Sequence, residues 1–360
     1  MYICPRASNC VLKLIKHFEK IFKDISVYFP ANICYTLPLS VSYSEAKIEL
    51  YDIDFNTLYP DFIKICQKTR EGILRFSENS LTIFVVVIPY GNWSIEEMNT
   101  TKEKARKILG SNLFILWDCA LCFPTKERIN YILNNLTEDQ GFLFSFSYAK
   151  PIELGFGSVL FTKQKINHSF ENTIDKNTSS FLVNRVDKIF KTYLNFDKIK
   201  NKRQTYICYN SELEKEDSKY IYQMLENILK QEDFYIQLRK NQNTSYYEIL
   251  NKKIENNSLF RRNLEIQGIQ ILDNDNLSWR FNIRVYREMR DKIIEKIFRR
   301  GGFVSRLFPN ISGILGKPKR EYENTSKNWE TIINIFNNQQ YHYNQIIIDS
   351  IQEAFYCELK

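Results

Sequence analysis

The sequence lacks the features that would place the protein in a membrane or outside the cell. No apolar run approaches the roughly 20 residues that a membrane-spanning helix requires, and the longest, 81–89, has the length of a strand. The N-terminus, MYICPRASN, does not have the charged and then apolar plan of a secretion signal. These absences predict a soluble, cytoplasmic protein without a membrane partner.

Residues that commonly bind metals are few or widely spaced. The only three histidines are His17, His168 and His342, which are scattered along the chain. Cys119 and Cys122 form a C-x-x-C, but no second pair and no histidine cluster accompanies it. We therefore interpret the eight cysteines as reduced thiols packed in the core of a cytosolic protein. No metal site is predicted.

The positive charges do not form a stripe. The formal net charge is +8, which permits attraction to anions such as nucleotides. The basic residues alternate with acidic ones, as in 212–219 and 284–300, and such runs are typical of solvated helix faces. Because no basic stripe carries interleaved aromatic residues, we predict no nucleic-acid partner.

What the sequence does contain is an alternation of apolar strands and amphipathic helices. Strands are predicted at 26–29, 47–51, 81–88, 112–117, 142–146 and 159–161, and helices at 10–22, 34–43, 58–76, 95–109 and 126–135. Continuous apolar strands that alternate with helices indicate an α/β fold with a mostly parallel, doubly wound sheet covered on both faces.

The composition changes after Lys163. Residues 167–180 are polar and rich in Asn, Ser and Thr, as in a linker or exposed loop. Beyond them the pattern predicts helices at 181–194, 215–230, 246–268, 288–300 and 343–355, a strand at 278–285, and a helix stop at 301–302. We predict a large α/β domain over 1–165 and a smaller C-terminal α+β domain over 166–360.

Three features of the large domain could meet at one site. Asp118 ends one predicted strand, and Lys150 follows another in the stretch GFLFSFSYAKPIELGFGSVLFT, residues 141–162. In parallel sheets ligands bind beyond the carboxyl ends of the strands. Ser8 or Asn9 could cap the first helix, whose start is also suited to a phosphate.

Lys150 has two interpretations. It lies either in a hairpin that directs it to solvent, or between buried strands, where an ammonium group is costly unless it is paired or made neutral. A Schiff base with the aldehyde of pyridoxal phosphate (PLP) would make it neutral. PLP also needs N–H donors for its phosphate and an anion for its pyridinium nitrogen, which the helix start and Asp118 could supply.

Ordered motifs in residues 3–163 make the sequence similar to the DegT-type (DegT/StrS) sugar aminotransferases, a branch of the fold-type I PLP-dependent enzymes. The motifs are ASNCVL at 7–12, FP at 29–30, YDID at 51–54, PYG at 89–91, ILWDCA at 115–120, FSF-x-x-x-K at 144–150 and G-x-G at 155–157. The C-terminal half follows that family only in general pattern.

The resemblance implies a role for each matching position. Lys150 would carry the Schiff base and afterwards move the proton, and Asp118 would hold the pyridinium proton. The implied cofactor-binding set is completed by phosphate contacts from Ser8, Asn9 and Ser145, and by ring contacts from Cys34 or Ala120.

Several positions depart from the family pattern. Leu121 replaces a glutamine that contacts the PLP hydroxyl, and Ser8-Asn9 replaces Gly-Thr in the phosphate loop. Phe156 and Ser158 replace an acidic residue and a glycine. The family's phosphate-binding Asn from the neighbouring subunit has only weak counterparts, at 184–185 and 262–263.

The resemblance implies an aminotransferase that uses PLP, with glutamate as donor and a nucleotide-linked keto-sugar as acceptor, in surface-polysaccharide or related sugar biosynthesis. The alternative is a PLP-fold protein that has lost transamination and serves as a binding or interaction module, as Leu121 and Ser8-Asn9 suggest. A homodimer is expected in either case, because the 22 Tyr and 26 Phe exceed the needs of one core.

Overall fold

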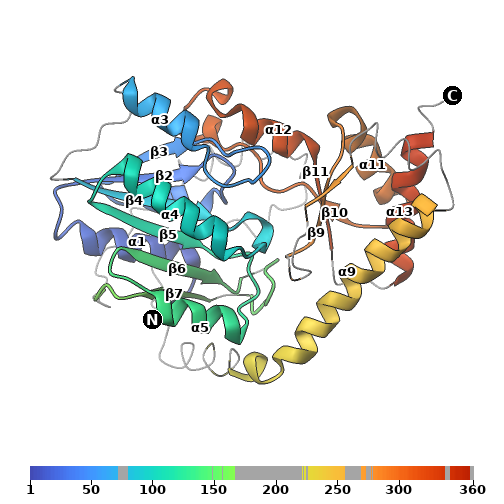
Figure 1. Ribbon diagram of the computed structural model, residues 1–360, viewed down its shortest axis with the longest axis horizontal. Helices are drawn as coiled ribbons and strands as arrows, with labels where there is room; N and C mark the ends of the chain where they lie inside the picture. Colours follow the sequence, from blue (N-terminus) through green and yellow to red (C-terminus); the bar gives the residue numbers. More distant parts are fainter. Residues whose placement is uncertain are drawn as a thin grey trace.

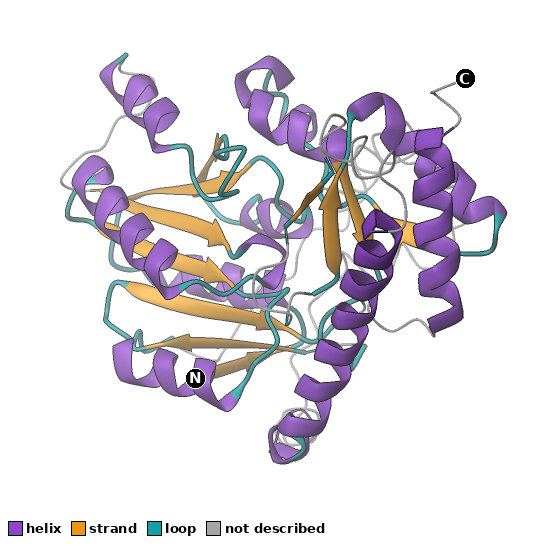
Figure 2. Ribbon diagram, turned by 45° about the vertical axis from the view of Figure 1, so that its right-hand side comes forward, coloured by secondary structure: helices purple, strands orange, loops and turns teal. Residues whose placement is uncertain are grey.

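The computed structural model contains two β-sheets that lie side by side, each covered by helices (Figures 1 and 2). It describes residues 1–71, 80–147, 149–155, 157–166, 221, 223, 226–255, 269–272, 277, 279–336 and 341–356. The predicted linker at 167–180, the predicted helix at 181–194 and most of the one at 215–230 lie outside these residues. None of the described helices combines the length and apolar character needed to cross a membrane.

The larger sheet has seven strands, ordered β1-β7-β6-β5-β4-β2-β3. Their bounds are Tyr2–Cys4 (β1), Asp24–Pro30 (β2), Lys47–Tyr51 (β3), Ser80–Val87 (β4), Leu113–Asp118 (β5), Gln140–Ser145 (β6) and Ser158–Thr162 (β7). Strands β2 to β6 pair in parallel, whereas β7 is antiparallel to both of its neighbours. The predicted mostly parallel sheet is confirmed.

The central strands are apolar throughout because both faces of the sheet are buried. Side chains of a strand alternate between the two faces. In β4, Ile83 and Val85 pack in one hydrophobic core, and Phe84 and Val86 pack in the other. This explains why the run at 81–88 shows no polar alternation.

Two sets of helices pack against the two faces of the sheet and complete these cores. Helices α1 (Ala7–Phe18) and α2 (Thr36–Val41) cover one face. Helices α3 (Phe62–Arg70), α4 (Ile95–Leu109) and α5 (Lys126–Asn135) cover the other. The bounds predicted for α4 and α5 are confirmed. Both helices begin where predicted because side-chain oxygens of Ser94 and Thr125 cap them by accepting hydrogen bonds from backbone N–H groups.

Helix α1 begins three residues earlier than predicted, at Ala7, and ends at Phe18. Its N-cap residue is Arg6, so Ser8 and Asn9 lie in the first turn and neither is the N-cap. A capping preference is worth only about 1 kcal/mol. Here the packing of Cys10, Val11 and the later apolar residues of α1 against the sheet decides where the helix lies.

The smaller sheet has four antiparallel strands, ordered β10-β11-β9-β8. They are Val304–Ser305 (β10), Ile332–Ile335 (β11), Phe281–Arg284 (β9) and Gln270–Ile271 (β8), and helices α11 (Arg287–Arg299) and α13 (Tyr341–Tyr356) contribute to its core. Helix α11 ends at Arg299, just before the predicted stop at 301–302, where Gly301 has a φ of 82° that suits glycine.

Three elements of the C-terminal half connect it to the larger sheet. Helix α9 (Glu232–Glu255) packs Tyr235 and Ile236 against the core of the larger sheet, and Tyr246 is buried in the core of the smaller one. The short helices η3 (Ser312–Leu315) and η4 (Lys319–Tyr322) add Ile314 and Tyr322 to the larger sheet's other core. The two parts therefore share hydrophobic packing.

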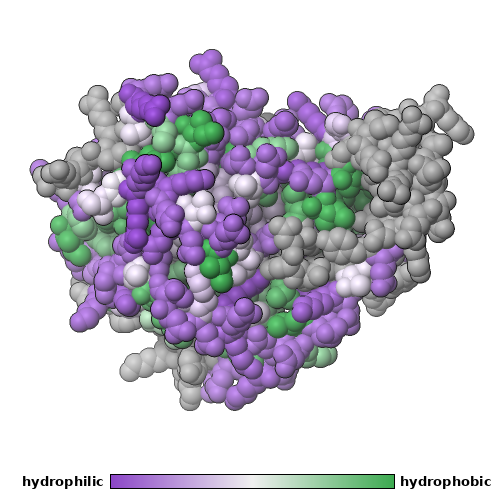
Figure 3. All heavy atoms as spheres, viewed as in Figure 1, coloured by the Kyte–Doolittle hydropathy of each residue, from purple (hydrophilic) through white to green (hydrophobic). Residues whose placement is uncertain are grey.

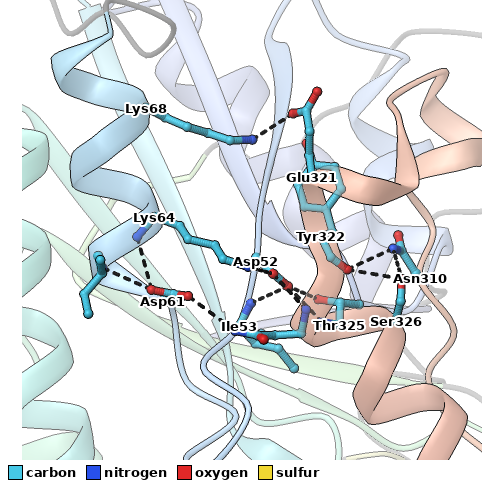
Figure 4. A network of polar contacts seen from close by, with 12 residues as sticks. Asp52, Ile53, Asp61, Lys64, Lys68, Asn310, Glu321, Tyr322, Thr325 and Ser326 are labelled. Atoms are coloured by element: carbon cyan, nitrogen blue, oxygen red, sulfur yellow. Dashed lines mark hydrogen bonds and ion pairs between the residues drawn. The ribbon is translucent and has the colours of Figure 1, made fainter.

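A buried aspartate forms a polar connection between the two parts (Figure 4). Asp52, which follows β3 and is 3% exposed, accepts hydrogen bonds from the backbone N–H groups of Asn324 and Thr325 at the start of α12 (Glu323–Thr331), at 3.0 and 2.9 Å. Lys64 of α3 completes the cluster at 2.6 Å. The carboxylate is thus placed where the helix dipole favours negative charge.

We expect Asp52→Ala to lower the free energy of unfolding by about 3 kcal/mol, because it leaves buried donors unpaired. The matched control is Glu321→Gln at the same interface. Glu321 pairs with Lys68 at 2.9 Å, but its side chain is 41% exposed, so its loss is expected to cost less than about 1 kcal/mol. Denaturant unfolding of both variants measures this difference, and equal destabilisation would contradict the prediction.

Candidate active site

A cavity of about 220 Å³ lies beyond the carboxyl ends of the parallel strands. Its walls come from the start of α1, from the loops after β2, β5 and β6, and from the C-terminal half. The main lining residues are Arg6, Ala7, Ser8, Asn32, Ile33, Cys34, Asp118, Ala120, Leu121, Ser145, Ser147, Ala149, Lys150, Trp279, Leu307 and Phe308. The cavity is therefore where a parallel sheet is expected to bind a ligand.

Asp118, the last residue of β5, provides a buried negative charge. It is 5% exposed, and its Oδ1 accepts a hydrogen bond from the N–H of Ala120 at 3.0 Å. Burial raises the pKa of Asp118, and the positive charge of Lys150 partly opposes that increase. Asp118 and Lys150 thus act on each other electrostatically within one cavity.

Lys150 is partly buried and lines the cavity, which favours the second of its two interpretations. The preceding residue, Ala149, has a φ of 59°, which is unusual for a residue with a Cβ atom. The indole N–H of Trp279 donates to the Ala149 carbonyl oxygen at 2.7 Å, and the Trp279 backbone N–H donates to the carbonyl of Tyr90 at 2.9 Å. The C-terminal half therefore holds the backbone beside Lys150 in its strained conformation.

Another part of the cavity lining is suited to an anion. Helix α1 has no side-chain cap and no acidic residue in its first turn, which contains Ser8. The hydroxyls of Ser145 and Ser147 lie 3.1 Å apart. A helix N-terminus supplies N–H donors and a partial positive charge, and hydroxyl groups add further donors. Arg6 contributes a full positive charge to the same lining.

The structure brings together most of the residues singled out in the sequence. Ser8, Cys34, Asp118, Ala120, Ser145 and Lys150 all line the cavity. Asn9 is not among the lining residues, and its side-chain oxygen is buried without a hydrogen-bond partner in the described part of the chain. Leu121, the departure from the family's glutamine, also lines the cavity.

Arg6, Asn32, Ser147 and Trp279 are among the lining residues that sequence reasoning missed. Arg6 and Ser147 are close neighbours of motif residues, so their positions could have been found from those motifs. Asn32 follows β2 and has a buried side-chain oxygen without a partner among the described residues. Trp279 is 129 positions from Lys150 in the sequence, so no local signal indicated that it lies nearby.

The fold resembles that of several solved structures. Comparison with protein-family models and with curated proteins found no match. The fold is similar to that of a DegT DnrJ EryC1 StrS aminotransferase from Brucella abortus, with a TM-score of 0.58 and 14% identity over 98% of this chain and 84% of that one. It is likewise similar to PseC from Helicobacter pylori, an aminotransferase involved in pseudoaminic acid biosynthesis, with a TM-score of 0.60 and 15% identity over 99% and 86% of the two chains.

A third similar structure is the GDP-4-keto-6-deoxy-D-mannose-3-dehydratase of E. coli with bound hydrated PLP. Its TM-score is 0.58, at 14% identity over 98% of this chain and 87% of that one. Identities this low show shared fold. The chain therefore has the fold of PLP-dependent sugar aminotransferases of the DegT type and of their dehydratase relative.

Proposed function

We propose that the protein is a PLP-dependent aminotransferase that transfers an amino group, with glutamate as donor, to a nucleotide-linked keto-sugar of surface-polysaccharide or related sugar biosynthesis. The observation that carries the proposal is that Lys150 and the buried Asp118 line one cavity at the carboxyl ends of the parallel strands. Burying a carboxylate is costly unless it meets a cation or several donors.

The residues of the cavity fit PLP. Asp118 receives one backbone hydrogen bond from within the described chain, at its Oδ1, and its charge suits a protonated pyridine nitrogen. Ser8, Ser145 and Ser147, with the start of α1, would hold the phosphate. When bound, PLP supplies an aldehyde and an electron-withdrawing ring that stabilises negative charge at the amino-bearing carbon of a substrate.

The reaction assigns separate tasks to the two charged residues. Lys150 Nζ, in its neutral form, would be the nucleophile toward the cofactor's aldehyde, and would then remove and return the proton at the reacting carbon of the substrate. Asp118 would stay ionised when it holds the protonated ring nitrogen, and its fixed charge would stabilise that positive charge. The apolar side chains of Ala120, Leu121 and Phe308 in the lining would limit the access of water to the site.

Fold alone does not determine the reaction, since a dehydratase shares it with aminotransferases. The alternative for this chain is a module that has lost transamination, in line with Leu121 at the glutamine position. Retention of Lys150 and Asp118 in one cavity favours the enzyme, because a site without a ligand would gain stability by losing the buried charge.

We also propose that the protein acts as a homodimer. Phe234 and Leu238 of α9 are 63% and 45% exposed, which suits an interface. Hydrophilic side chains make up most of the coloured part of the face seen in Figure 3, and the apolar patches there are separate. Light scattering at micromolar protein concentration tests the assembly, and a strictly monomeric protein that still binds PLP tightly would contradict it.

The function is tested by titrating the purified protein with PLP and following the visible absorption band of a PLP–lysine adduct. Borohydride treatment, proteolysis and mass spectrometry should then find the reduced adduct on Lys150. Adding glutamate should convert the band and release 2-oxoglutarate. No adduct would refute a PLP enzyme, and an adduct that no amino donor changes would favour the binding module.

A further inference from the structure

A second cavity, of about 280 Å³, adjoins the first. The two share Ala149, Lys150 and Trp279 as lining residues. The second is also lined by Glu153, Tyr235, Arg239, Arg280 and Phe336. Since Lys150 lines both, a substrate reaching this lysine can extend into the second cavity.

Arg280 is the most buried charged residue of the second cavity, at 4% exposure. Its guanidinium carbon lies 3.8 Å from the ring centre of Trp279 and 3.6 Å from that of Phe336, so the group is held between two aromatic rings. Its Nη1 donates to the Ser305 hydroxyl. A guanidinium has five N–H donors in a planar fork, and the stacked rings cannot accept hydrogen bonds in that plane.

No carboxylate among the described residues pairs with Arg280. Glu153 is near enough to raise the pKa of Arg280, but the larger effect is burial, which lowers that pKa. Glu153 itself is exposed. A buried cation whose neighbours are aromatic rings and one hydroxyl is destabilising unless an anion joins it.

Arg239, the other arginine of this cavity, differs in its contacts. It donates from Nη2 to the carbonyl oxygen of Pro151 at 2.8 Å, and its guanidinium lies 5.5 Å from the ring centre of Phe123. It is also less buried than Arg280. The two arginines therefore contribute positive charge to one cavity but differ in how fully they are desolvated.

From these contacts we propose that Arg280 is the binding residue for an oxyanion of a substrate that reaches Lys150 through the second cavity. The guanidinium fork binds a carboxylate or a phosphate oxygen pair equally well by geometry. In the proposed function these are the carboxylate of the amino donor and the diphosphate of the nucleotide sugar. The identity of the substrate rests on the proposed function. The anion site itself is inferred from the cavity and the buried arginine.

The experiment measures anion binding by isothermal titration calorimetry on the full-length, PLP-loaded protein. Glutarate, which has no amino group and cannot react, represents the donor, and uridine diphosphate represents the nucleotide. Arg280→Gln is expected to weaken the binding of one probe about 10- to 100-fold, the range for a charge-assisted hydrogen bond. Arg280→Lys keeps the charge without the fork, and should give an intermediate loss.

Arg239→Gln is the matched control, since it removes one positive charge from the same cavity. It should weaken binding by less than about threefold, because its side chain is more solvated. Circular dichroism and the PLP absorption band, unchanged in all three variants, show that the fold and the cofactor site are intact. If Arg280→Gln does not fold, Arg280→Lys supplies the comparison.

Loss of glutarate binding alone assigns the site to the donor carboxylate, and loss of uridine diphosphate binding alone assigns it to the phosphates. Arg280 is not the anion site if neither probe binds the wild-type protein, or if Arg280→Gln and Arg239→Gln weaken the binding of the probes equally. These outcomes differ from a failure of the proposed function, which would appear earlier as a wild-type protein without a PLP adduct.

Discussion

Lys150→Ala is expected to abolish turnover while the protein stays folded. The amine of Lys150 is the only lysine nitrogen in the lining of the cavity within the described chain, and it serves both as the attachment point and as the acid–base group in the proposed reaction. None of its neighbours can replace it: Asp118 is an anion, and Ser145 and Ser147 are hydroxyls. Activity should fall to the background rate, and the borohydride-stable adduct should disappear from the mass spectrum.

Lys163→Ala is the matched control for that experiment. Lys163 follows β7, the partner of β6, and its side chain is exposed. Removing it should change neither the adduct nor the rate, and both variants should keep the wild-type circular dichroism spectrum. If Lys150→Ala retains the PLP adduct, the assignment of Lys150 is wrong. If Lys163→Ala loses it, the attachment point lies elsewhere.

Asp118→Asn is expected to reduce kcat about 10²- to 10³-fold, which is the typical effect of removing one preorganised electrostatic partner. Asparagine has nearly the same shape, and its carbonyl oxygen can still accept the hydrogen bond from the Ala120 N–H. The variant therefore removes the charge and leaves the geometry. The rate with glutamate, measured at saturating PLP, separates this effect from a loss of cofactor affinity.

The same substitution should stabilise the PLP-free protein at neutral pH. Burial raises the pKa of Asp118 above its value in the unfolded chain. An acid with a raised folded-state pKa holds its proton longer when folded, so stability falls as the pH rises through that pKa, and Asn removes this loss. The gain in Tm over the wild type should therefore vanish below about pH 4, where the carboxyl is protonated in both states.

Glu103→Gln serves as the control for the change of charge, since Glu103 is exposed on α4. It should leave kcat and Tm unchanged at every pH. An Asp118→Asn protein with normal kcat would contradict the electrostatic role of Asp118. A lower Tm for PLP-free Asp118→Asn than for the PLP-free wild type would mean that the charged carboxylate stabilises the fold through its contacts.

The local sequence pattern was sufficient to predict most of the larger sheet and its helices. Continuous apolar runs such as 81–88 record burial on both faces, and the helices at 95–109 and 126–135 carry their own capping residues, so these elements follow from short stretches of sequence. The positions of Asp118 at the end of β5 and of Lys150 in the loop after β6 followed from the same runs. Burial periodicity and capping are local properties, which is why the sequence alone determined these elements.

Tertiary structure decided the rest. The start of α1 depended on packing against the sheet rather than on the preference of Ser8 for a cap. The contacts of Trp279 with Ala149, and of Asp52 with Thr325, join residues 130 and 273 positions apart. Nothing in the local sequence distinguishes Arg280 from the other basic residues. Only its position between two aromatic rings, in a cavity that Lys150 also lines, does so. Such contacts depend on the path of the whole chain, which no local pattern of residues contains.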